Sequence, residues 1–345
     1  MPKDNENISL FADLPSPPAE PQGFAPDQMV RCDECLRANP PTRVECFYCG
    51  KALSVSEANA AHARPSLRPL EKWEQGYSNI LIKYPAEGLS NQSIEQAAAL
   101  LRLAVADLNR ITLARKPLPL ARTATPEEAL LIERGLGALG LETMIVSDQA
   151  LALEASPPRR LRTIEMLEED LVVYPTSGAT SIEGNRIPWS GITLVVTGRL
   201  FAKQVETKER KRRGSEKQII DARETSSDEA IIDFYTQKQD GGWRIMANNF
   251  DFSCLGDRKT LLASENFATL INLIRDYASG AEHDDSYNSL RRSLELAWPS
   301  EQQTSALGWR RDRAGKYSTA EVAMMSNESQ FTRYSRLCHF LKATQ

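Results

Sequence analysis

The chain of 345 residues lacks the features that mark most membrane proteins and many enzymes. It has no run of about 20 apolar residues, which is the length that a membrane-spanning helix needs. It also has no phosphate loop of the GxxxxGK[ST] type, no GxSxG nucleophile turn and no HExxH zinc motif. We therefore expect no membrane span, and no motif points to a catalytic activity.

Basic charge and histidine are scarce as well. The formal net charge is -4 and the chain holds only three histidines, so any surface that binds anions has to be local. The first 20 residues show no basic stretch followed by an apolar core, so we expect no secretory signal. Four of the six cysteines lie in close pairs, whereas Cys254 and Cys338 stand far apart. A disulfide framework is therefore not expected, and a cytoplasmic location fits better.

What the sequence does have is a set of four cysteines near its N-terminus. Cys32 and Cys35 form one Cys-x-x-Cys pair, ten residues follow, and Cys46 and Cys49 form a second pair. Two such pairs supply four thiolates for one tetrahedral Zn2+. Because four protein ligands leave no open position for a substrate water, we expect a structural site. The segment 30–53 is too short to fold on an apolar core, so zinc should supply its folding free energy.

The spacing Cys32-x2-Cys35-x3-Asn39-x6-Cys46-x2-Cys49 resembles that of RanBP2-type zinc fingers and of short zinc ribbons. The resemblance covers residues 30–53 only. Val30 stands where RanBP2-type fingers usually carry a Trp, two residues before the first cysteine. Leu36-Arg37 stands where the ubiquitin-binding members carry Thr-Phe, so the resemblance does not imply ubiquitin recognition.

The RNA-binding members of that family stack bases on aromatic or arginine side chains and use the asparagine and arginines at base edges. Aromatic rings and guanidinium groups do stack on unpaired bases. The resemblance thus implies a contact set for single-stranded RNA or DNA, or alternatively for a protein partner. That set is Arg37, Asn39, Arg43, Phe47 and Tyr48.

A second candidate for anion binding is the basic run at residues 208–213, which we expect to be a flexible loop between two strands. One interpretation is a clamp for phosphate groups of nucleic acid or lipid. The alternative, which we favour, is a solvated loop that nearby glutamates partly neutralise. The basic residues concerned are Lys208, Arg210, Lys211, Arg212 and Arg213.

The remaining chain predicts a multidomain α+β protein. Residues 1–29 are acidic and rich in proline, which predicts a disordered tail, and residues 54–75 are typical of a linker. Residues 76–153 alternate strand, helix, extended piece, helix and strand, which predicts a small α+β sandwich with helices on one face of its sheet. Ser93 and Thr125 are the predicted helix starts, since each has a capping-box partner three residues later.

Residues 160–281 read as several strands followed by an amphipathic helix at 262–277. This order resembles a pleckstrin-homology-like barrel with a closing helix, an analogy of fold that carries no functional residues. Residues 282–345 are predicted to be a helical extension, with one helix at 287–298, a polar loop, and another helix at 330–341.

Three functions are compatible with these features. The first is a non-enzymatic adaptor with a structural zinc finger and a protein partner. The second is a binder of single-stranded RNA or DNA that uses the finger and the basic run 208–213. The third is an enzyme whose site lies between the two larger domains, around Cys254 in a turn after a strand.

Overall fold

The computed structural model describes residues 24–54, 64–71, 73–83, 88–154, 157–176, 184–212, 218–237, 241–313 and 316–344. The chain divides into two compact units, Met1–Ser66 and Leu67–Gln345. Most of the predicted tail 1–29 and part of the linker 54–75 lie outside the described residues. No helix in the described part of the chain is long and apolar enough to cross a membrane.

The first unit contains the zinc-finger segment and little regular structure. The 3-10 helix η1 (Pro26–Gln28) precedes the strand β1 (Val30–Arg31), which pairs antiparallel with β2 (Ala38–Asn39). A single bridge joins Glu45 to Ala52. The apolar cluster of the segment is small and consists of Cys32, Cys46 and Leu53, with Val30 and Cys35 at its edge.

The second unit begins with a three-stranded antiparallel sheet in the order β4-β3-β5. Helix α4 packs on all three of these strands, and α2 packs on α3 and α4. The bounds are β3 (Tyr77–Lys83), α2 (Asn91–Leu101), α3 (Val105–Leu113), β4 (Leu118–Thr123), α4 (Pro126–Ala138) and β5 (Glu142–Ser147). The strands and helices predicted for 76–153 are therefore present.

The two predicted helix starts differ in outcome. Thr125 caps α4 as predicted, and its hydroxyl accepts a hydrogen bond from the Glu128 N–H at 3.3 Å. Helix α2, in contrast, begins after Ser90, whose hydroxyl accepts from the Ser93 N–H at 3.0 Å. Ser93 competes poorly as a cap because Ser90 offers the same hydroxyl one turn earlier. Arg102 then adopts a left-handed backbone and separates α2 from α3.

The rest of the unit is organised by a nine-stranded sheet. Its order in the described residues is β13-β14-β9-β10-β11-β6-β7-β8, with β12 paired to β9 off this path. The bounds are β6 (Arg159–Met166), β7 (Asp170–Pro175), β8 (Asn185–Pro188), β9 (Ile192–Arg212), β10 (Gln218–Thr236), β11 (Trp243–Met246), β12 (Glu282–Asp284), β13 (Glu301–Arg313) and β14 (Lys316–Ser326).

This sheet is open, and the predicted barrel-like closure is wrong for the described residues. The two ends of the strand order, β8 and β13, do not pair with each other. The predicted covering helix is present as α5 (Ala263–Tyr277), and Phe267, Leu270 and Ile274 face the core. Three short 3-10 helices, η2 (Trp189–Gly191), η3 (Ala247–Asn249) and η4 (Phe252–Arg258), lie between strands or before α5.

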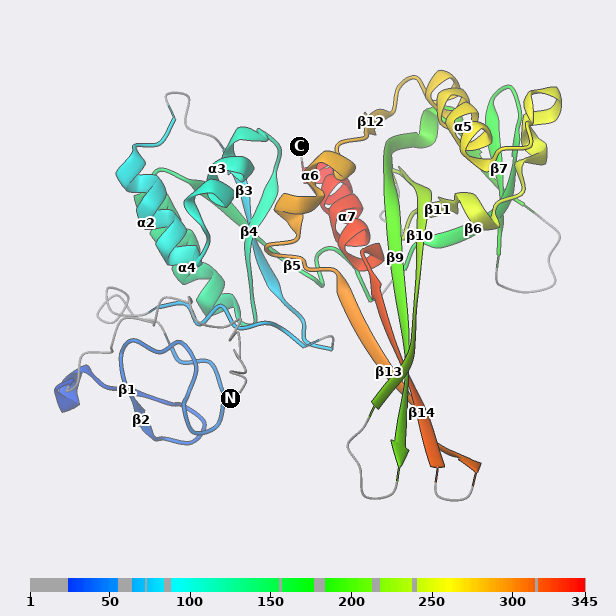
Figure 1. Cartoon of the computed structure of the whole chain (residues 1–345). Coiled ribbons are helices and arrows are strands. Elements are labelled where there is room, and N and C mark those ends of the chain that lie inside the picture. Colours follow the sequence, from blue (N-terminus) through cyan, green and yellow to red (C-terminus); the bar gives the residue numbers. More distant parts are fainter. Residues whose placement is uncertain are drawn as a thin grey trace. The chain divides into compact units, whose positions relative to one another are not determined.

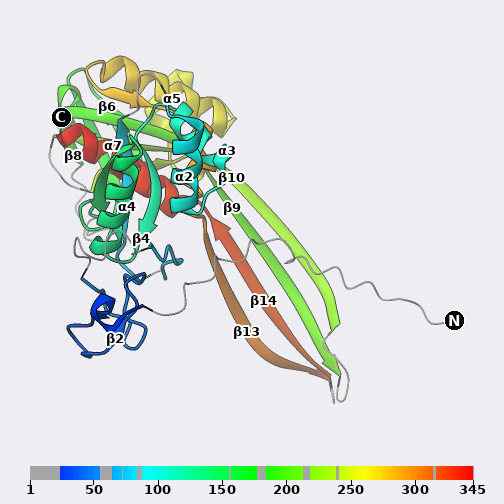
Figure 2. The same ribbon diagram turned by 90° about the vertical axis from the view of Figure 1, so that its left-hand side faces the viewer.

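The predicted helical extension 282–345 also needs correction. It contains α6 (Tyr287–Leu294) and α7 (Glu328–Thr344), but the segment expected to be a polar loop forms the antiparallel hairpin of β13 and β14. Strand β14 pairs with the outer part of β9. Together β9, β10, β13 and β14 form a long four-stranded arm that runs away from the helices of this unit (Figure 1 and Figure 2).

The predicted domains 76–153 and 160–281 share one core in the structure. Strand β9 alternates, with Leu194 and Val196 in the same apolar cluster as Ile80 and Leu108, and Val195 in a second cluster with α5. Strand β3 is likewise buried on both faces. Asn79 donates to the Ala129 carbonyl of α4, while Ser78 accepts from the indole N–H of Trp298 at 3.0 Å.

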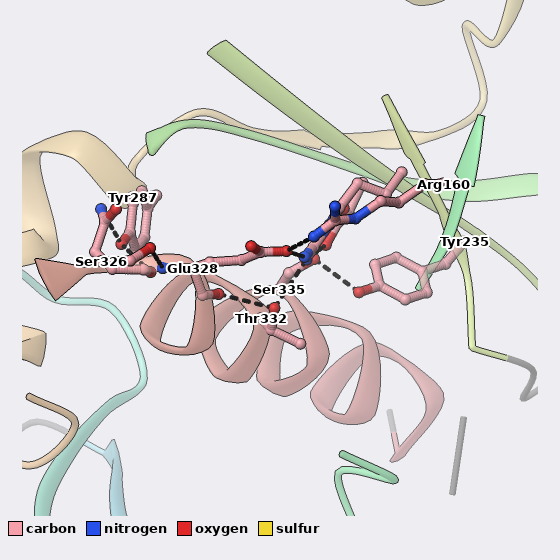
Figure 3. Close-up of polar contacts among 10 residues, drawn as sticks. Arg160, Tyr235, Tyr287, Ser326, Glu328, Thr332 and Ser335 are labelled. Atoms are coloured by element: carbon pink, nitrogen blue, oxygen red, sulfur yellow. Dashed lines mark hydrogen bonds and ion pairs between the residues drawn. The ribbon is translucent and has the colours of Figure 1, made fainter. Parts of the chain in front are cut away.

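Helix α7 is anchored in this core by polar contacts at its first turns (Figure 3). The buried Arg244 guanidinium donates to both carboxylate oxygens of buried Asp233 at 2.7 Å and to Glu328 at 3.1 Å. Arg160 donates to the same Glu328 oxygen at 2.6 Å. Burial alone would lower the pKa of Arg244, but the adjacent Asp233 and Glu328 carboxylates outweigh it and raise the pKa.

We predict that Arg244→Met destabilises the protein by about 3–5 kcal/mol, because it leaves the Asp233 carboxylate buried without its partner. The double variant Arg244→Met/Asp233→Leu should regain most of that loss, since it removes both charges. Chemical denaturation followed by tryptophan fluorescence measures both. The control is Arg186→Met, which breaks an exposed pair with Asp170 and should cost less than about 1 kcal/mol. A loss for Arg244→Met as small as the control's would contradict the prediction.

Candidate metal centre

The four cysteine sulfurs converge on one point, as the sequence predicts. All four Sγ atoms lie within 4.8 Å of one another. Cys32 Sγ is 3.6 Å from Cys49 Sγ, and Cys35 Sγ is 3.5 Å from Cys46 Sγ. Zinc–sulfur bonds of about 2.3 Å in a tetrahedron put neighbouring sulfurs about 3.8 Å apart. The thiols are therefore spaced as a Zn2+ ion requires.

The two cysteine pairs have the same backbone geometry. The carbonyls of Cys32 and Cys46 accept hydrogen bonds from the N–H groups of Leu36 and Gly50, both at 2.9 Å. Leu36 and Gly50 both have a positive φ, 59° and 73°, where the chain turns back past each pair. Glycine adopts this conformation freely, whereas leucine does so at a cost of roughly 1–2 kcal/mol. Each pair thus forms a tight knuckle that presents two sulfurs on one side.

Asn39 connects the two knuckles from inside the module. Its side chain is fully buried, and its carbonyl oxygen accepts a hydrogen bond from the Phe47 N–H at 2.8 Å. Its amide nitrogen donates to the Arg37 carbonyl at 3.0 Å and to Cys46 Sγ at 3.4 Å. A buried amide with these partners offers no edge to a nucleotide base. In this geometry Asn39 is a positioning residue for a ligand, although the family resemblance had suggested a contact role.

The ionisation of the thiols also suits a cation. Burial works to raise the pKa of Cys46, but hydrogen bonds from the backbone of Tyr48 and Cys49 and from Asn39 outweigh it and lower the pKa to about 6. A backbone hydrogen bond from Lys51 works to lower the pKa of Cys49, but burial and the neighbouring thiols raise it to about 12. Four thiolates cannot coexist at this spacing without a compensating charge. A divalent ion supplies that charge, so the residues fit zinc.

The outer surface of the second knuckle carries two exposed aromatic rings. Phe47 is 69% exposed and Tyr48 is 52% exposed, and their rings meet edge to face with centroids 5.5 Å apart. The Arg43 guanidinium lies over the Phe47 ring at 5.3 Å, and that of Arg37 lies over the Tyr48 ring at 4.7 Å. These four side chains, Arg37, Arg43, Phe47 and Tyr48, form a continuous row that we call the knuckle face.

The basic run lies in the second unit. Residues 208–212 are part of β9, and Lys208 is in register with Asp221 of β10. The predicted flexible loop is therefore wrong for residues 208–212. The strand continues because β14 pairs with its other edge as far as Arg212. Arg213 lies outside the described residues. The phosphate clamp stays a prediction for Lys208, Arg210, Lys211, Arg212 and Arg213.

Neither remaining cysteine has the environment of a reactive thiol. Cys254 lies in η4, and burial raises its pKa to about 11. Cys338 is buried in α7, and burial together with the nearby Asp284 carboxylate raises its pKa. A thiol with a raised pKa holds little of the nucleophilic thiolate. One pocket of about 330 Å³ is lined by Arg160, Leu161, Arg162, Thr176, Met246 and Asn249, and Cys254 is not among them.

Comparison with known protein families found none that matches the chain, and comparisons with curated proteins and with solved structures found no match either. The resemblance to RanBP2-type fingers therefore rests on the spacing of the cysteines and Asn39. The structure shows a four-cysteine cluster that is able to hold a metal ion.

We predict that the purified protein binds about one zinc ion per chain and that a strong chelator unfolds the module around Cys32–Cys49. The second unit should keep its unfolding midpoint, because the cores of the two units are separate. All five tryptophans belong to residues 67–345, so their fluorescence reports that unit alone. A shift of the tryptophan midpoint on chelation, or a metal-free protein with an ordered module, would contradict this prediction.

We also predict that Asn39→Ala lowers the affinity for zinc about 10- to 100-fold, because it removes a hydrogen bond to a ligand and frees the second knuckle. Competition with a chromophoric chelator measures the affinity. Arg37→Ala, which changes an exposed neighbour, should leave it within about twofold. Equal affinities for the two variants would show that Asn39 does not position Cys46.

Proposed function

We propose that this protein is a non-enzymatic, zinc-binding adaptor of the cytoplasm and that the knuckle face is its contact surface for a protein partner. The observation that carries the proposal is the exposed pair Phe47 and Tyr48 on a module that zinc holds rigid. Aromatic and arginine side chains supply most of the binding energy at protein interfaces. Two adjacent aromatic rings more than half exposed are difficult to explain as packing.

The charge of the module supports a protein partner over a nucleic acid. Residues 30–53 carry four basic side chains and three carboxylates. A Zn2+ ion with four thiolates adds about two negative charges. The zinc-loaded module is therefore close to neutral, and it lacks the general positive field that attracts phosphate backbones. Its positive charge is confined to the two arginines beside the rings.

Single-stranded nucleic acid stays the second candidate because of one specific contact pattern. Guanidinium groups over aromatic rings, as for Arg43 with Phe47 and Arg37 with Tyr48, also form stacking platforms for unpaired bases. In this case the RanBP2-type resemblance would extend to function. Binding to phosphates would fall steeply with salt, whereas contacts made through apolar rings would not.

The test compares three forms of the zinc-loaded full-length protein: the unaltered chain, Phe47→Ser/Tyr48→Ser, and the control Leu36→Asn. Leu36 is equally exposed on the module, outside the knuckle face, and Asn tolerates its left-handed backbone. We predict that the double variant retains about one zinc and loses at least tenfold in affinity for its protein partner. Leu36→Asn should behave like the unaltered chain.

Two measurements decide between the candidates. Affinity capture with quantitative mass spectrometry identifies proteins that the unaltered chain and Leu36→Asn enrich and the double variant does not. Fluorescence anisotropy with single-stranded RNA at two salt concentrations tests the second candidate. Salt-sensitive RNA binding that the double variant loses, without any face-dependent protein, would replace the first proposal by the second.

A further inference from the structure

The knuckle face lies in the same compact unit as the N-terminal residues of the chain. Its surface combines two exposed rings with a guanidinium on each side. A ligand that fits this row needs apolar side chains for the rings and carboxylates for the arginines. A short acidic and apolar peptide has both, and each contact is of a kind that holds in water.

The chain itself carries such a peptide sequence ahead of the module. Residues 8–14 read Ile-Ser-Leu-Phe-Ala-Asp-Leu and hold four large apolar side chains. Residues 1–23 contain four carboxylates, Asp4, Glu6, Asp13 and Glu20, against a single basic side chain, Lys3. The segment is therefore acidic where the knuckle face is basic, and apolar where the face is aromatic.

The covalent connection is short enough to make a weak contact effective. Leu14 and Phe24, the first described residue, are ten residues apart, which allows a reach of at most about 33–36 Å. The module itself consists of only 24 residues, 30–53. A ligand tethered on this scale has an effective concentration in the millimolar range. Even a low intrinsic affinity then leads to substantial occupancy of the face.

We propose that residues 8–14 bind the knuckle face of their own chain, with apolar side chains on Phe47 and Tyr48 and carboxylates facing Arg37 and Arg43. The inference rests on the proposed function, because it takes the same face to be a binding surface. The segment then competes with the external protein partner. A partner has to exceed the tethered segment in affinity, which makes binding selective.

The first experiment uses zinc-loaded full-length protein labelled with 15N at phenylalanine and tyrosine. The variant Leu10→Ser/Phe11→Ser removes two central apolar side chains, and Ala12→Ser is the matched control in the same segment. The amide signals of Phe47 and Tyr48 should shift in the double variant and stay in place in the control. A synthetic peptide of residues 4–16, added to the double variant, should move the signals back toward their original positions.

The second experiment measures competition. The same peptide should bind the Leu10→Ser/Phe11→Ser chain about tenfold more tightly than the unaltered chain, whose face the tethered segment occupies. Adding Arg37→Ala and Arg43→Ala to the double variant should abolish peptide binding while the zinc content stays at about one. Unshifted signals in the double variant, or a peptide that does not bind it, would overturn the inference.

The outcome separates this inference from the proposed function. If Phe47→Ser/Tyr48→Ser still loses its protein partner while the peptide has no effect, the adaptor function stands and the tethered contact is wrong. If the peptide binds as expected and no partner depends on the face, the contact stands and the adaptor function is wrong. An increase in partner capture by Leu10→Ser/Phe11→Ser would support both.

Discussion

The guanidinium of Arg244 sets the constraint on which the larger unit depends. A buried cation is tolerated only where carboxylates and hydrogen-bond acceptors surround it. Asp233 on β10 supplies a bidentate partner, and Glu328 and Thr332 on α7 supply the others. The charge is compensated in full only when α7 lies against the sheet. The contact therefore fixes the place of the C-terminal helix and not only its stability.

Other contacts extend that constraint through the unit. Asn327, directly before α7, accepts from the Phe201 N–H of β9 at 2.6 Å and donates to the Tyr287 hydroxyl of α6. Gln330 donates to the carbonyl of Trp298, whose indole N–H reaches Ser78 on β3. A chain of buried polar contacts thus joins α7, α6 and the small sheet. Apolar packing alone would allow several arrangements, whereas directional bonds of this kind select one.

Local features of the fold could be predicted from the sequence, and long-range ones could not. The cap at Thr125, the apolar face of α5 and the cysteine spacing each depend on residues a few positions apart. The hairpin of β13 and β14 depends on β9, about a hundred residues earlier, which supplies the pairing for a segment whose own sequence is polar. The double burial of β3 depends on Trp298 for the same reason.

The metal centre shows the same division. Four cysteines at two short spacings identify the ligands, because tetrahedral zinc restricts the geometry so strongly. The sequence placed Asn39 among the contact residues, since exposure cannot be read from a motif. The structure buries its amide between the knuckles, where it orients a ligand. The rows of arginine over aromatic ring were also invisible, because Arg43 and Phe47 meet only after the knuckle closes.

The small size of the zinc module limits how it can recognise a partner. A segment of 24 residues with an apolar cluster of three buried side chains has little surface to spare for a large interface. Its affinity has to come from a few side chains that the metal holds in place before binding, since ordering costs are then already met. The aromatic pair and its two arginines are such a set. Recognition by a short, tethered or exposed peptide suits a face of this size better than a broad protein surface does.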